Sequence, residues 1–459
     1  MRHKSQDYIP KKNVGIFIDQ TQAIRNFIES DAFSDMQDAF NVYYILPEKL
    51  NKRIVEPAWI EERLKPIRIS IPQKRYELWT QISLVRQLRY RPGKYYKKLR
   101  KMRTRNIGIK ASLYLRFLSL PVVYSVYTLT ARYFLCLHKF TELTELLNTY
   151  DFDIILHPTT LSGLFINDLI LTARHKGIDL IALLNSWDNP STKASIVGSP
   201  SLTLVWGEQT RQHAIKYAQI PEDSVLVFGA AQFDIYKNKV DRECAKIAYG
   251  FTKNDTVILF AGSSLNIDEL QYLTCLDNFL HDLSSSNIYI IYRPYVYQMS
   301  STLAQKILAY KFTHVRLDSS TVELLETTAK GTLLPYPSSY SFTKQLLDIS
   351  DIIISPLSTI LLEGLLNGVK PICIYPDAID DDFSPQNSPL VHFEDFLALP
   401  VVSTVTNIHD LLLALVALLY DDNCRSTESL RNYSQPFVEM FEHSYSIRLR
   451  KLIESRLSR

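Results

Sequence analysis

The chain has little glycine and little cysteine, and each scarcity excludes a kind of site. Its 459 residues include 13 glycines, less than half the usual share. A glycine-rich phosphate-binding loop is therefore unexpected, and helix N-termini carrying serine or threonine would have to bind any phosphate. The five cysteines are scattered and form no CxxC pair. This pattern excludes a disulfide framework and a zinc site of paired cysteines, and it predicts buried thiols in a reducing cytoplasm.

A strong charge imbalance and a long apolar run are also missing. The net charge of +3 is nearly neutral for this length, and the hydrophobic fraction of 46% is typical of a globular protein. Residues 1–13 contain no apolar stretch, so we expect no signal peptide. Residues 111–137 are apolar, but arginines interrupt them. The longest uncharged part has about fifteen residues, fewer than the roughly 20 that a membrane-spanning helix needs.

Short apolar runs rich in β-branched residues alternate with helical patterns along the whole chain. This alternation is typical of α/β domains with parallel sheets. The chain is too long for one ordinary core, so we predict two such domains of about 200 residues each. No internal repeat or low-complexity tract is present.

The most informative stretch is residues 348–376, DISDIIISPLSTILLEGLLNGVKPICIYP. It predicts a buried strand over 352–355, a helix over about 358–367 and a second strand over 371–375, which together form a parallel β-α-β unit. Gly368 stands where the end of a helix favours a left-handed backbone.

A polar face on this predicted helix indicates a binding site. Thr359, Glu363 and Asn367 recur at spacing four and share one side of the helix. Glu363 is too far from Ser358 and Thr359 to close a capping box, which needs spacing three, so its carboxylate is available for a ligand. Ser358 and Thr359 stand at the helix N-terminus, where phosphate binds. Phosphate there and a ribose on Glu363 would make a nucleotide-sugar site.

The pattern D-I-I-I-S-x-x-S-T-x-x-x-E-G-L-x-x-G-x-K-P resembles the nucleotide-binding unit of GT-B glycosyltransferases. The resemblance is greatest to bacterial surface-polysaccharide glycosyltransferases, with CDP-glycerol glycerophosphotransferases and UDP-N-acetylglucosamine 2-epimerases as relatives. It implies an α/β GT-B fold, two Rossmann-like domains facing across a cleft, with the diphosphate on Ser358 and Thr359 and the ribose on Glu363. Many retaining members carry a second Glu where this chain has Ser355, which implies an inverting enzyme.

The same resemblance suggests the domain boundaries. Residues 229–238, GAAQFDIYKN, are similar to the element that links the two GT-B domains, with alanine in place of its proline. We therefore predict an acceptor-side domain over residues 1–235 and a donor-binding domain over 236–425. In the final segment, 426–459, we expect a helix over about 430–458 that crosses back to the first domain.

Two more strand ends in the second half offer groups for phosphate. One run ends in Ser263 and Ser264 ahead of a predicted helix. Another ends at Arg293, where related transferases carry a basic residue before proline; its planar guanidinium suits phosphate, and a salt bridge inside the fold is the alternative. No DxD motif lies in a suitable loop, and the acidic run 380–382 lies outside the phosphate turn. We therefore expect no metal and no cofactor, only a nucleotide-sugar substrate.

The candidate catalytic bases are Asp188, then Asp19, then His157, each at the end of a predicted strand, where ligands of open α/β sheets bind. Asp188 lies in a polar loop that resembles the W-D-N loop of some surface-polysaccharide glycosyltransferases. Burial by Trp187 would raise its pKa. The alternatives are an Asx turn made by Asp188 or Asn189, a helix N-cap for Asp19 and a structural role for His157.

Residues 86–110 are basic, contain no acidic residue and precede the apolar segment 111–137. No recognised nucleic-acid module accompanies them, so we expect no nucleic acid partner. A basic segment beside an apolar, tyrosine-rich one is typical of a surface that binds anionic lipid. The alternative is an insertion whose charged face is solvated. We expect a cytoplasmic protein that binds peripherally to the inner face of the plasma membrane through residues 86–137.

These patterns together predict a glycosyltransferase, inverting and metal-independent. It would move a sugar from a nucleotide donor to a cell-surface polysaccharide, such as capsule or lipopolysaccharide, or to a lipid-linked glycan. Two alternatives keep the same fold: transfer of glycerol phosphate and epimerisation of a nucleotide sugar. A third is an inert GT-B scaffold that binds membrane or nucleic acid.

Overall fold

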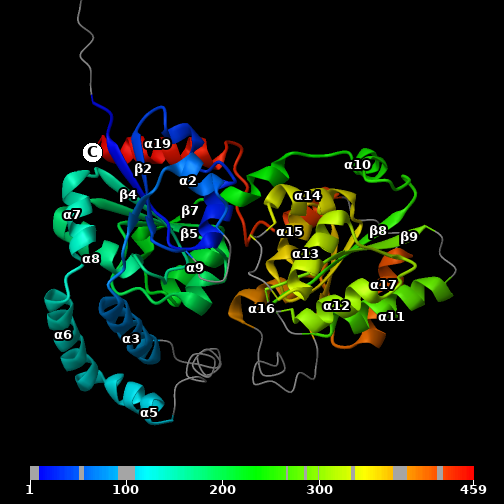
Figure 1. Cartoon of the computed structure of the whole chain (residues 1–459), viewed down its shortest axis with the longest axis horizontal. Helices are drawn as coiled ribbons and strands as arrows, with labels where there is room; N and C mark the ends of the chain where they lie inside the picture. The colour runs from blue at the N-terminus through cyan, green and yellow to red at the C-terminus, as the bar shows by residue number, and fades with distance from the viewer. Residues whose placement is uncertain are drawn as a thin grey trace, which may run out of the picture.

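The computed structural model describes residues 10–50, 56–90, 109–264, 267–283, 287–297, 299–331, 336, 338–375, 390–420 and 427–458. These residues form two α/β units side by side, each built on one parallel sheet with helices on both faces (Figure 1). The first sheet has the strand order β3-β2-β1-β4-β5-β6-β7 and the second has β10-β9-β8-β11-β12-β13. The predicted class, two Rossmann-like α/β units, is confirmed.

The strands of each sheet run parallel to one another. The first sheet contains β1 (Asn13–Phe17), β2 (Asn41–Pro47), β3 (Ile67–Ile69), β4 (Ile154–Thr159), β5 (Asp179–Leu184), β6 (Leu202–Val205) and β7 (Val225–Val227). The second contains β8 (Thr256–Ala261), β9 (Ile288–Arg293), β10 (Val315–Arg316), β11 (Ile352–Pro356), β12 (Lys370–Ile374) and β13 (Ser403–Val405).

The helices of the first unit are α1 (Thr21–Ala23), α2 (Trp59–Leu64), α3 (Gln73–Tyr90), α5 (Ile109–Leu118), α6 (Pro121–Leu137), α7 (Thr141–Thr149), α8 (Ile166–Lys176) and α9 (Glu208–Lys216). Those that follow are α10 (Arg242–Ala248), α11 (Glu269–Asp282), α12 (Ser301–Ala309), α13 (Ser319–Ala329), α14 (Tyr340–Ile349), α15 (Thr359–Leu366), α16 (Val391–Leu397), α17 (Ile408–Leu419), α18 (Thr427–Asn432) and α19 (Tyr445–Leu457). Short turns are η1 (Ile24–Ile28) and η3 (Asn189–Lys193), which are π-helical, and η2 (Ser34–Met36), η4 (Glu222–Ser224) and η5 (Ala231–Lys237), which are 3₁₀.

Each sheet is buried on both faces, which explains the uninterrupted apolar strands. In β4, Ile154 and Leu156 face one core and Ile155 faces the other. In β11, Ile353 faces one core while Ile352 and Ile354 face the other. Successive strand residues point to opposite faces, so a strand covered on both sides is apolar at every position.

The chain joins its two units through aromatic packing. Trp187, from the loop after β5, packs edge-on against Phe393 and Phe396 of α16 and against Phe437, with ring centroids 5.2, 5.9 and 5.5 Å away. The terminal helix α19 lies along the first unit, coloured red in Figure 1, where Tyr445 and Leu449 join its core. These aromatic rings therefore pack the two units together beside the cavity that Trp187 and Phe393 line.

The expected helix over 430–458 is wrong as a single element. α18 ends at Asn432 and α19 begins only at Tyr445. Pro436 lies between them, and a proline cannot donate the backbone hydrogen bond that a helix interior requires. The next residues, Phe437 and Val438, are buried in the core that also contains Trp206, so tertiary packing fixes this segment in a non-helical path.

The predicted cysteine environment is only partly correct. Cys373 is buried, but Cys136 and Cys244 are exposed because they lie on outward faces of α6 and α10. The described residues do not include Cys424 or the acidic run 380–382. They also leave out residues 91–108, which make up most of the basic segment 86–110.

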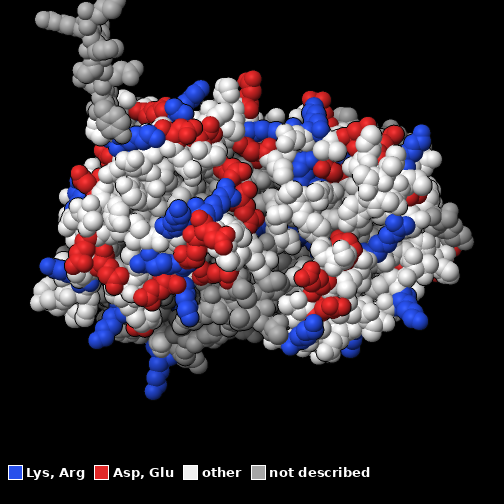
Figure 2. All heavy atoms as spheres, turned by 45° about the horizontal axis from the view of Figure 1, so that its top comes forward, with Lys and Arg blue, Asp and Glu red and all other residues white. Residues whose placement is uncertain are grey.

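Helices α5 and α6 extend from the first unit at the lower left of Figure 1. Across the described ranges, we find no helix that combines the length and the apolar character required to cross a membrane. On the face drawn in Figure 2, Lys and Arg side chains intermingle with Asp and Glu side chains over both units. That face therefore carries no extended area of one charge.

Candidate active site

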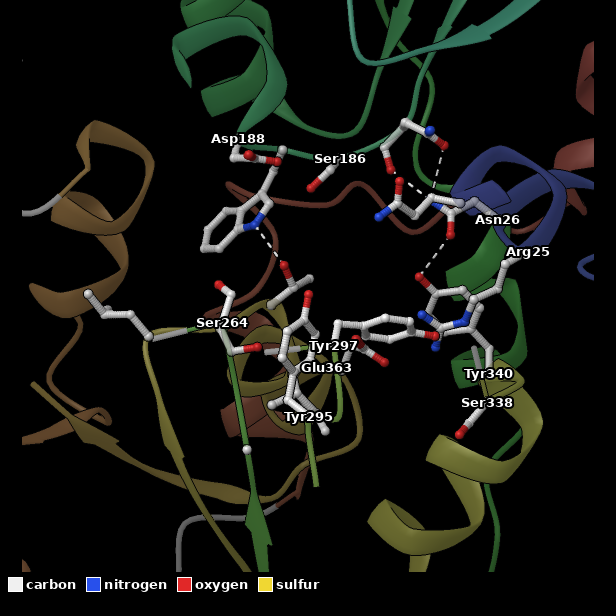
Figure 3. Close-up of a pocket in the computed structure, with 18 of the residues that line it drawn as sticks. Arg25, Asn26, Ser186, Asp188, Ser264, Tyr295, Tyr297, Ser338, Tyr340 and Glu363 are labelled. Carbon is white, nitrogen blue, oxygen red and sulfur yellow. Dashed lines mark hydrogen bonds between the residues drawn. The ribbon is translucent and has the colours of Figure 1, made fainter. Parts of the chain in front are cut away.

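A cavity of about 370 Å³ lies between the two sheets (Figure 3). Its walls include residues directly after β4 and β5 of the first sheet, Thr160 and Asn185. They also include residues directly after β8, β9 and β11 of the second sheet, Gly262, Pro294 and Leu357. The carboxyl ends of both sheets thus meet at one place, which is where ligands bind in open α/β sheets.

The start of α15 forms one wall of this cavity. Ser358 is the N-cap residue, with an extended backbone at φ −156° and ψ 154°, and its side chain makes no capping hydrogen bond. Thr359 Oγ1 accepts a hydrogen bond of 3.2 Å from Trp187 Nε1 of the first unit. Both residues line the cavity. The positive end of the helix therefore faces the cavity.

Glu363 lies one turn further along α15 and also lines the cavity. Its side chain is buried, and Oε2 accepts a hydrogen bond of 2.7 Å from the Tyr236 hydroxyl. Burial raises its pKa above the ordinary value, while Arg25, Tyr236 and Arg293 act in the opposite direction. Asn367, the third member of the polar face, instead bonds Asp348 Oδ1 at 3.0 Å, so the polar face is only partly a ligand surface.

Arg25 is a cavity residue that sequence reasoning missed. After β1 the chain forms the short α1 and then the π-helical turn η1, which carries Arg25 and Asn26 into the cavity wall. The guanidinium of Arg25 stacks on the Tyr340 ring, with its Cζ 3.9 Å from the ring centroid. π-helical turns are frequent at functional sites. The available signal was an arginine soon after the first strand.

Arg293, at the end of β9, lines the same cavity and donates a hydrogen bond of 3.3 Å to Thr343 Oγ1. Burial and the neighbouring Arg25 charge lower its pKa. The Nε atoms of Arg25 and Arg293 are both buried without a hydrogen-bond partner among the described residues. Two guanidiniums that repel each other in one cavity suit an anionic ligand, because an anion would satisfy both.

The two predicted serines differ in position. Ser264 lines the cavity, whereas Ser263 is buried and is not among the described lining residues. Just before them, Gly262 has no space for a side chain, since an added Cβ would lie 2.7 Å from the Tyr295 nitrogen and 2.5 Å from Glu269 Oε1. The backbone after β8 therefore passes close to both neighbours at the cavity edge.

Asp188 lines the cavity on the side opposite Ser264 and Glu363 (Figure 3), but its environment differs from the expectation. Its carboxylate accepts hydrogen bonds of 2.9 Å from both Asn189 Nδ2 and Thr192 Oγ1. Burial raises its pKa, but Lys193, 3.6 Å away, and the hydrogen-bond donors outweigh burial and lower the pKa to about 2. The predicted upward shift of the Asp188 pKa is therefore wrong, and the carboxylate bonds two side chains of its own turn.

Asp19 and His157 lie behind the cavity and are not among the described residues that line it. Asp19 Oδ2 accepts a hydrogen bond of 2.7 Å from the Leu164 nitrogen, close to the start of α8. His157 Nδ1 lies 2.7 Å from the Phe17 carbonyl inside the sheet. Burial raises the pKa of Asp19 and lowers that of His157. The expectation that these strand ends face the cleft is wrong, because both side chains turn into the domain interior.

His392 is a second cavity residue that the sequence did not reveal. Its ring centroid lies 5.2 Å from that of Trp187, and its Nδ1 is buried without a hydrogen-bond partner in the described part of the chain. Burial lowers its pKa to about 4, although Asp188 acts in the opposite direction. A neutral imidazole therefore faces the cavity near Asp188. Within the described ranges, no group of three or more His, Cys, Asp or Glu side chains could hold a metal ion.

No protein-family model matches the sequence, and no curated protein matches it. Solved structures do match. A UDP-N-acetylglucosamine 2-epimerase candidate from Listeria monocytogenes has a TM-score of 0.55 and 11% identity, over 97% of this chain and 96% of its own. MnaA from S. aureus, solved with UDP, has a TM-score of 0.51 and 11% identity, over 98% and 97% of the two chains. The glycotransferase of kitacinnamycin has a TM-score of 0.51 and 13% identity, over 98% and 100%.

The fold is GT-B. These likenesses extend over nearly the whole of each chain, so they cover both units and the cavity between them. At identities of 11–13%, these likenesses show a shared fold and do not show a shared activity. The GT-B prediction made from residues 348–376 is thereby confirmed, and the activity must be argued from the site.

Proposed function

We propose that this protein is a glycosyltransferase that moves a sugar from a nucleotide donor to a cell-surface polysaccharide or lipid-linked glycan, with inversion and without a metal. One observation carries the proposal. The cavity at the carboxyl ends of both sheets brings together a helix N-terminus, the two guanidiniums of Arg25 and Arg293 and the carboxylate of Glu363. A diphosphate and a ribose require such a set of groups.

The donor diphosphate would bind at Ser358 and Thr359, where the α15 N-terminus supplies backbone donors and positive potential. Arg25 and Arg293 would neutralise its charge from two sides, and Glu363 would accept hydrogen bonds from the ribose hydroxyls. Ser264 lies on the same wall and offers a further hydroxyl. The S. aureus neighbour was solved with UDP, a ligand of the class proposed here.

Transfer would proceed by attack of an acceptor hydroxyl on the anomeric carbon. The bond from that carbon to the diphosphate oxygen breaks, and the nucleoside diphosphate leaves with the bonding electron pair. Arg25, Arg293 and the helix dipole would stabilise the charge that develops on it, as positioned cations do in phosphoryl chemistry. We assign removal of the acceptor proton to Asp188, which lies on the first-unit side of the cavity.

The experiment that tests the donor site is a thermal-shift panel of UDP, GDP, dTDP, CDP and CMP with the full chain. A ligand that binds only the native state raises the apparent stability of the protein and therefore its Tm. We expect one nucleoside diphosphate to raise Tm most. If no nucleotide raises Tm at concentrations that saturate ordinary donor sites, the proposed donor site is wrong.

Product analysis separates the related activities. Glycosyl transfer releases a nucleoside diphosphate, transfer of glycerol phosphate releases a nucleoside monophosphate, and epimerisation of a nucleotide sugar needs no acceptor. An inert scaffold would bind the nucleotide without turnover. Release of a nucleoside monophosphate would replace the proposal with glycerophosphotransfer.

We also propose that the protein acts as a peripheral protein on the cytoplasmic face of an anionic membrane. Helix α6 supports this proposal because its exposed apolar side chains, Val122, Val126, Leu129, Tyr133 and Leu137, recur at spacings of three and four and form one strip. Val122 is 78% exposed and Leu129 is 66% exposed. Contiguous exposed apolar surface of this kind marks a binding surface. The basic residues that precede it in sequence add attraction to anionic lipid.

A further inference from the structure

A second large cavity, of about 870 Å³, lies among helices α3, α6, α7 and α8. None of the described residues that line it also lines the donor cavity. Its floor is apolar and includes Trp79, Ile82, Leu135 and Ile170. The proposed transfer reaction gives this cavity no role.

The charged side chains that line this groove share one sign. They are Arg75, Arg86, Arg132, Lys139 and Arg174, and His175 accompanies them. No Asp or Glu occurs among the described residues of the lining. The charge of Arg75 is already compensated, since its Nε donates a hydrogen bond of 2.7 Å to Asp168 Oδ1 in the interior. Arg132, Lys139 and Arg174 are exposed at the rim. The groove thus offers an apolar floor and a cationic rim.

Helix α6 connects this groove with the exposed apolar strip. Val122, Val126 and Leu129 belong to the strip, whereas Tyr124 and Thr128 line the groove from the adjacent face of the same helix. Residues four apart share a helix face, so the two surfaces run side by side along α6. If the strip enters a membrane interface, the groove rim lies at the level of the lipid head groups.

We infer that this groove binds one anionic lipid, with its chain on the apolar floor and its phosphate near Arg132, Lys139 and Arg174. The occupant is inferred from charge complementarity. The cationic rim favours a ligand with an anionic group, and the apolar floor favours one that also has a hydrocarbon chain, which a free phosphate lacks. The inference goes beyond the proposed transfer reaction, because it concerns a site outside the donor cavity.

The test uses the full chain and a single-chain lysophosphatidic acid that carries bromine atoms in its acyl chain, kept below its micelle concentration. Bromine quenches tryptophan fluorescence on contact, and Trp79 lines the groove, whereas Trp187 and Trp206 line the donor cavity. We expect saturable quenching by this lipid and much weaker quenching by the same chain on a phosphocholine head. Inorganic phosphate should neither quench nor compete at matched concentration.

Three variants locate the bound chain. Thr128→Phe narrows the groove, and Arg132→Gln with Arg174→Gln removes two rim charges; both should reduce quenching several-fold. Trp79→Phe should abolish the lipid-dependent signal. Leu129→Gln, on the strip, is the matched control and should quench like the parent.

Absent or unsaturable quenching of the parent overturns the inference, and so does quenching that survives Thr128→Phe or Trp79→Phe. Equal quenching by the phosphocholine lipid also overturns it, because the cationic rim would then have no part. A dimer by sedimentation that Thr128→Phe breaks, without quenching of the parent, would assign the groove to a second copy of the chain. Because no vesicle or nucleotide is used, these results are independent of the membrane and donor proposals.

Discussion

Glu363 and Arg25 show how single residues acquire a role from their surroundings. Glu363 is buried near two guanidiniums, and the Tyr236 hydroxyl donates a hydrogen bond to it. Arg25 approaches from the other unit and stacks on Tyr340. A carboxylate held between opposite charges at a cavity wall is fixed in place, so its remaining acceptor capacity can serve a ligand.

Glu363→Ala should weaken nucleotide binding by about 1–3 kcal/mol, the usual worth of a hydrogen bond to a charged group. Titration calorimetry with the nucleotide identified in the thermal-shift panel measures this loss. Tyr236→Phe is the matched control, since it removes the hydroxyl that bonds Glu363 but keeps the carboxylate; we expect a smaller loss. Unchanged affinity in a folded Glu363→Ala protein would remove Glu363 from the donor site.

Asp188→Asn should remain folded, bind nucleotide normally and lose about 10²–10⁴-fold in turnover, the range that a general base supplies. Asparagine keeps one of the two acceptor oxygens that bond Asn189 and Thr192, but it cannot take a proton. The low pKa of Asp188, about 2, predicts that turnover of the parent shows no acid limb above pH 4 from this group. Near-parental turnover of Asp188→Asn would mean that Asp188 is not the base and that it only bonds Asn189 and Thr192. His392→Gln would then be the next variant to assay for turnover.

At the scale of elements, the β-α-β unit of β11, α15 and β12 is the part that the sequence describes best. The helix ends where predicted, with Gly368 at φ +72°. An added Cβ at this glycine would lie 2.0 Å from Thr427 Cγ2 of α18. Glycine is therefore required here for two reasons, the left-handed backbone and the close approach of α18. The same two features fix the end of α15.

Gly368→Ala should destabilise the protein more than Gly250→Ala does. Both glycines have a positive φ, +72° and +88°, but an added Cβ at Gly250 meets nothing within 4 Å. Gly250→Ala thus measures backbone strain alone, about 1 kcal/mol, and Gly368→Ala adds the clash with Thr427. Denaturant unfolding of the two variants measures how much free energy of unfolding each one loses. Equal losses would mean that α18 moves away from an added Cβ at position 368 without a cost in stability.

The exposed apolar strip on helix α6 leads to a prediction about membrane binding. Val126→Glu with Leu129→Glu should strongly reduce flotation with anionic vesicles, because both side chains belong to the exposed strip and are 60% and 66% exposed. Ile247→Glu, an equally exposed apolar residue on α10, is the matched control, at 60%. High salt should weaken flotation of the parent. If the parent does not float with anionic vesicles at low salt, the membrane proposal is wrong.

At the scale of the whole molecule, two histidines lie where the units meet. His213 belongs to α9 of the first unit and His392 to α16 of the second, and each has its pKa lowered to about 4, mainly by burial. The neighbouring His213 also lowers the pKa of His392, whereas nearby carboxylates act in the opposite direction, Asp395 on His213 and Asp188 on His392. Protonation of either would place a buried charge at the contact between the units.

Stability should therefore fall as the pH drops from 6.5 to 4, because in this window the unfolded chain binds protons at these histidines and the native protein does not. Glu269, with a pKa raised to about 7 by burial, acts in the opposite sense between pH 4.5 and 7, so the comparison must be between variants.

His392→Gln should flatten the dependence of unfolding free energy on pH between 6.5 and 4, whereas His175→Gln, at an exposed position on α8, should not. Denaturant unfolding across this pH range measures both. An unchanged slope in His392→Gln would show that this histidine is not buried in the neutral form.

Local patterns in the sequence determined the fold class and identified Ser358, Thr359 and Glu363, which line the cavity. Apolar strands, a helix start with Ser358 and Thr359, and Glu363 one turn later are all short-range features, so one stretch of chain encodes them. Prediction failed where partners are distant in sequence. Pro436 was local evidence against one long helix, but the burial of Phe437 that fixes the segment depends on Trp187 and Trp206.

Only the tertiary structure decided which side chains meet across the cleft. Arg25 enters the cavity because a π-helical turn redirects it, and His392 does so because α16 packs on Trp187. The pKa of Asp188 falls although burial alone would raise it, since Lys193 and two hydrogen-bond donors lie within reach. Electrostatic effects and burial are set by every neighbour in space, and a linear sequence specifies those neighbours only through the completed fold.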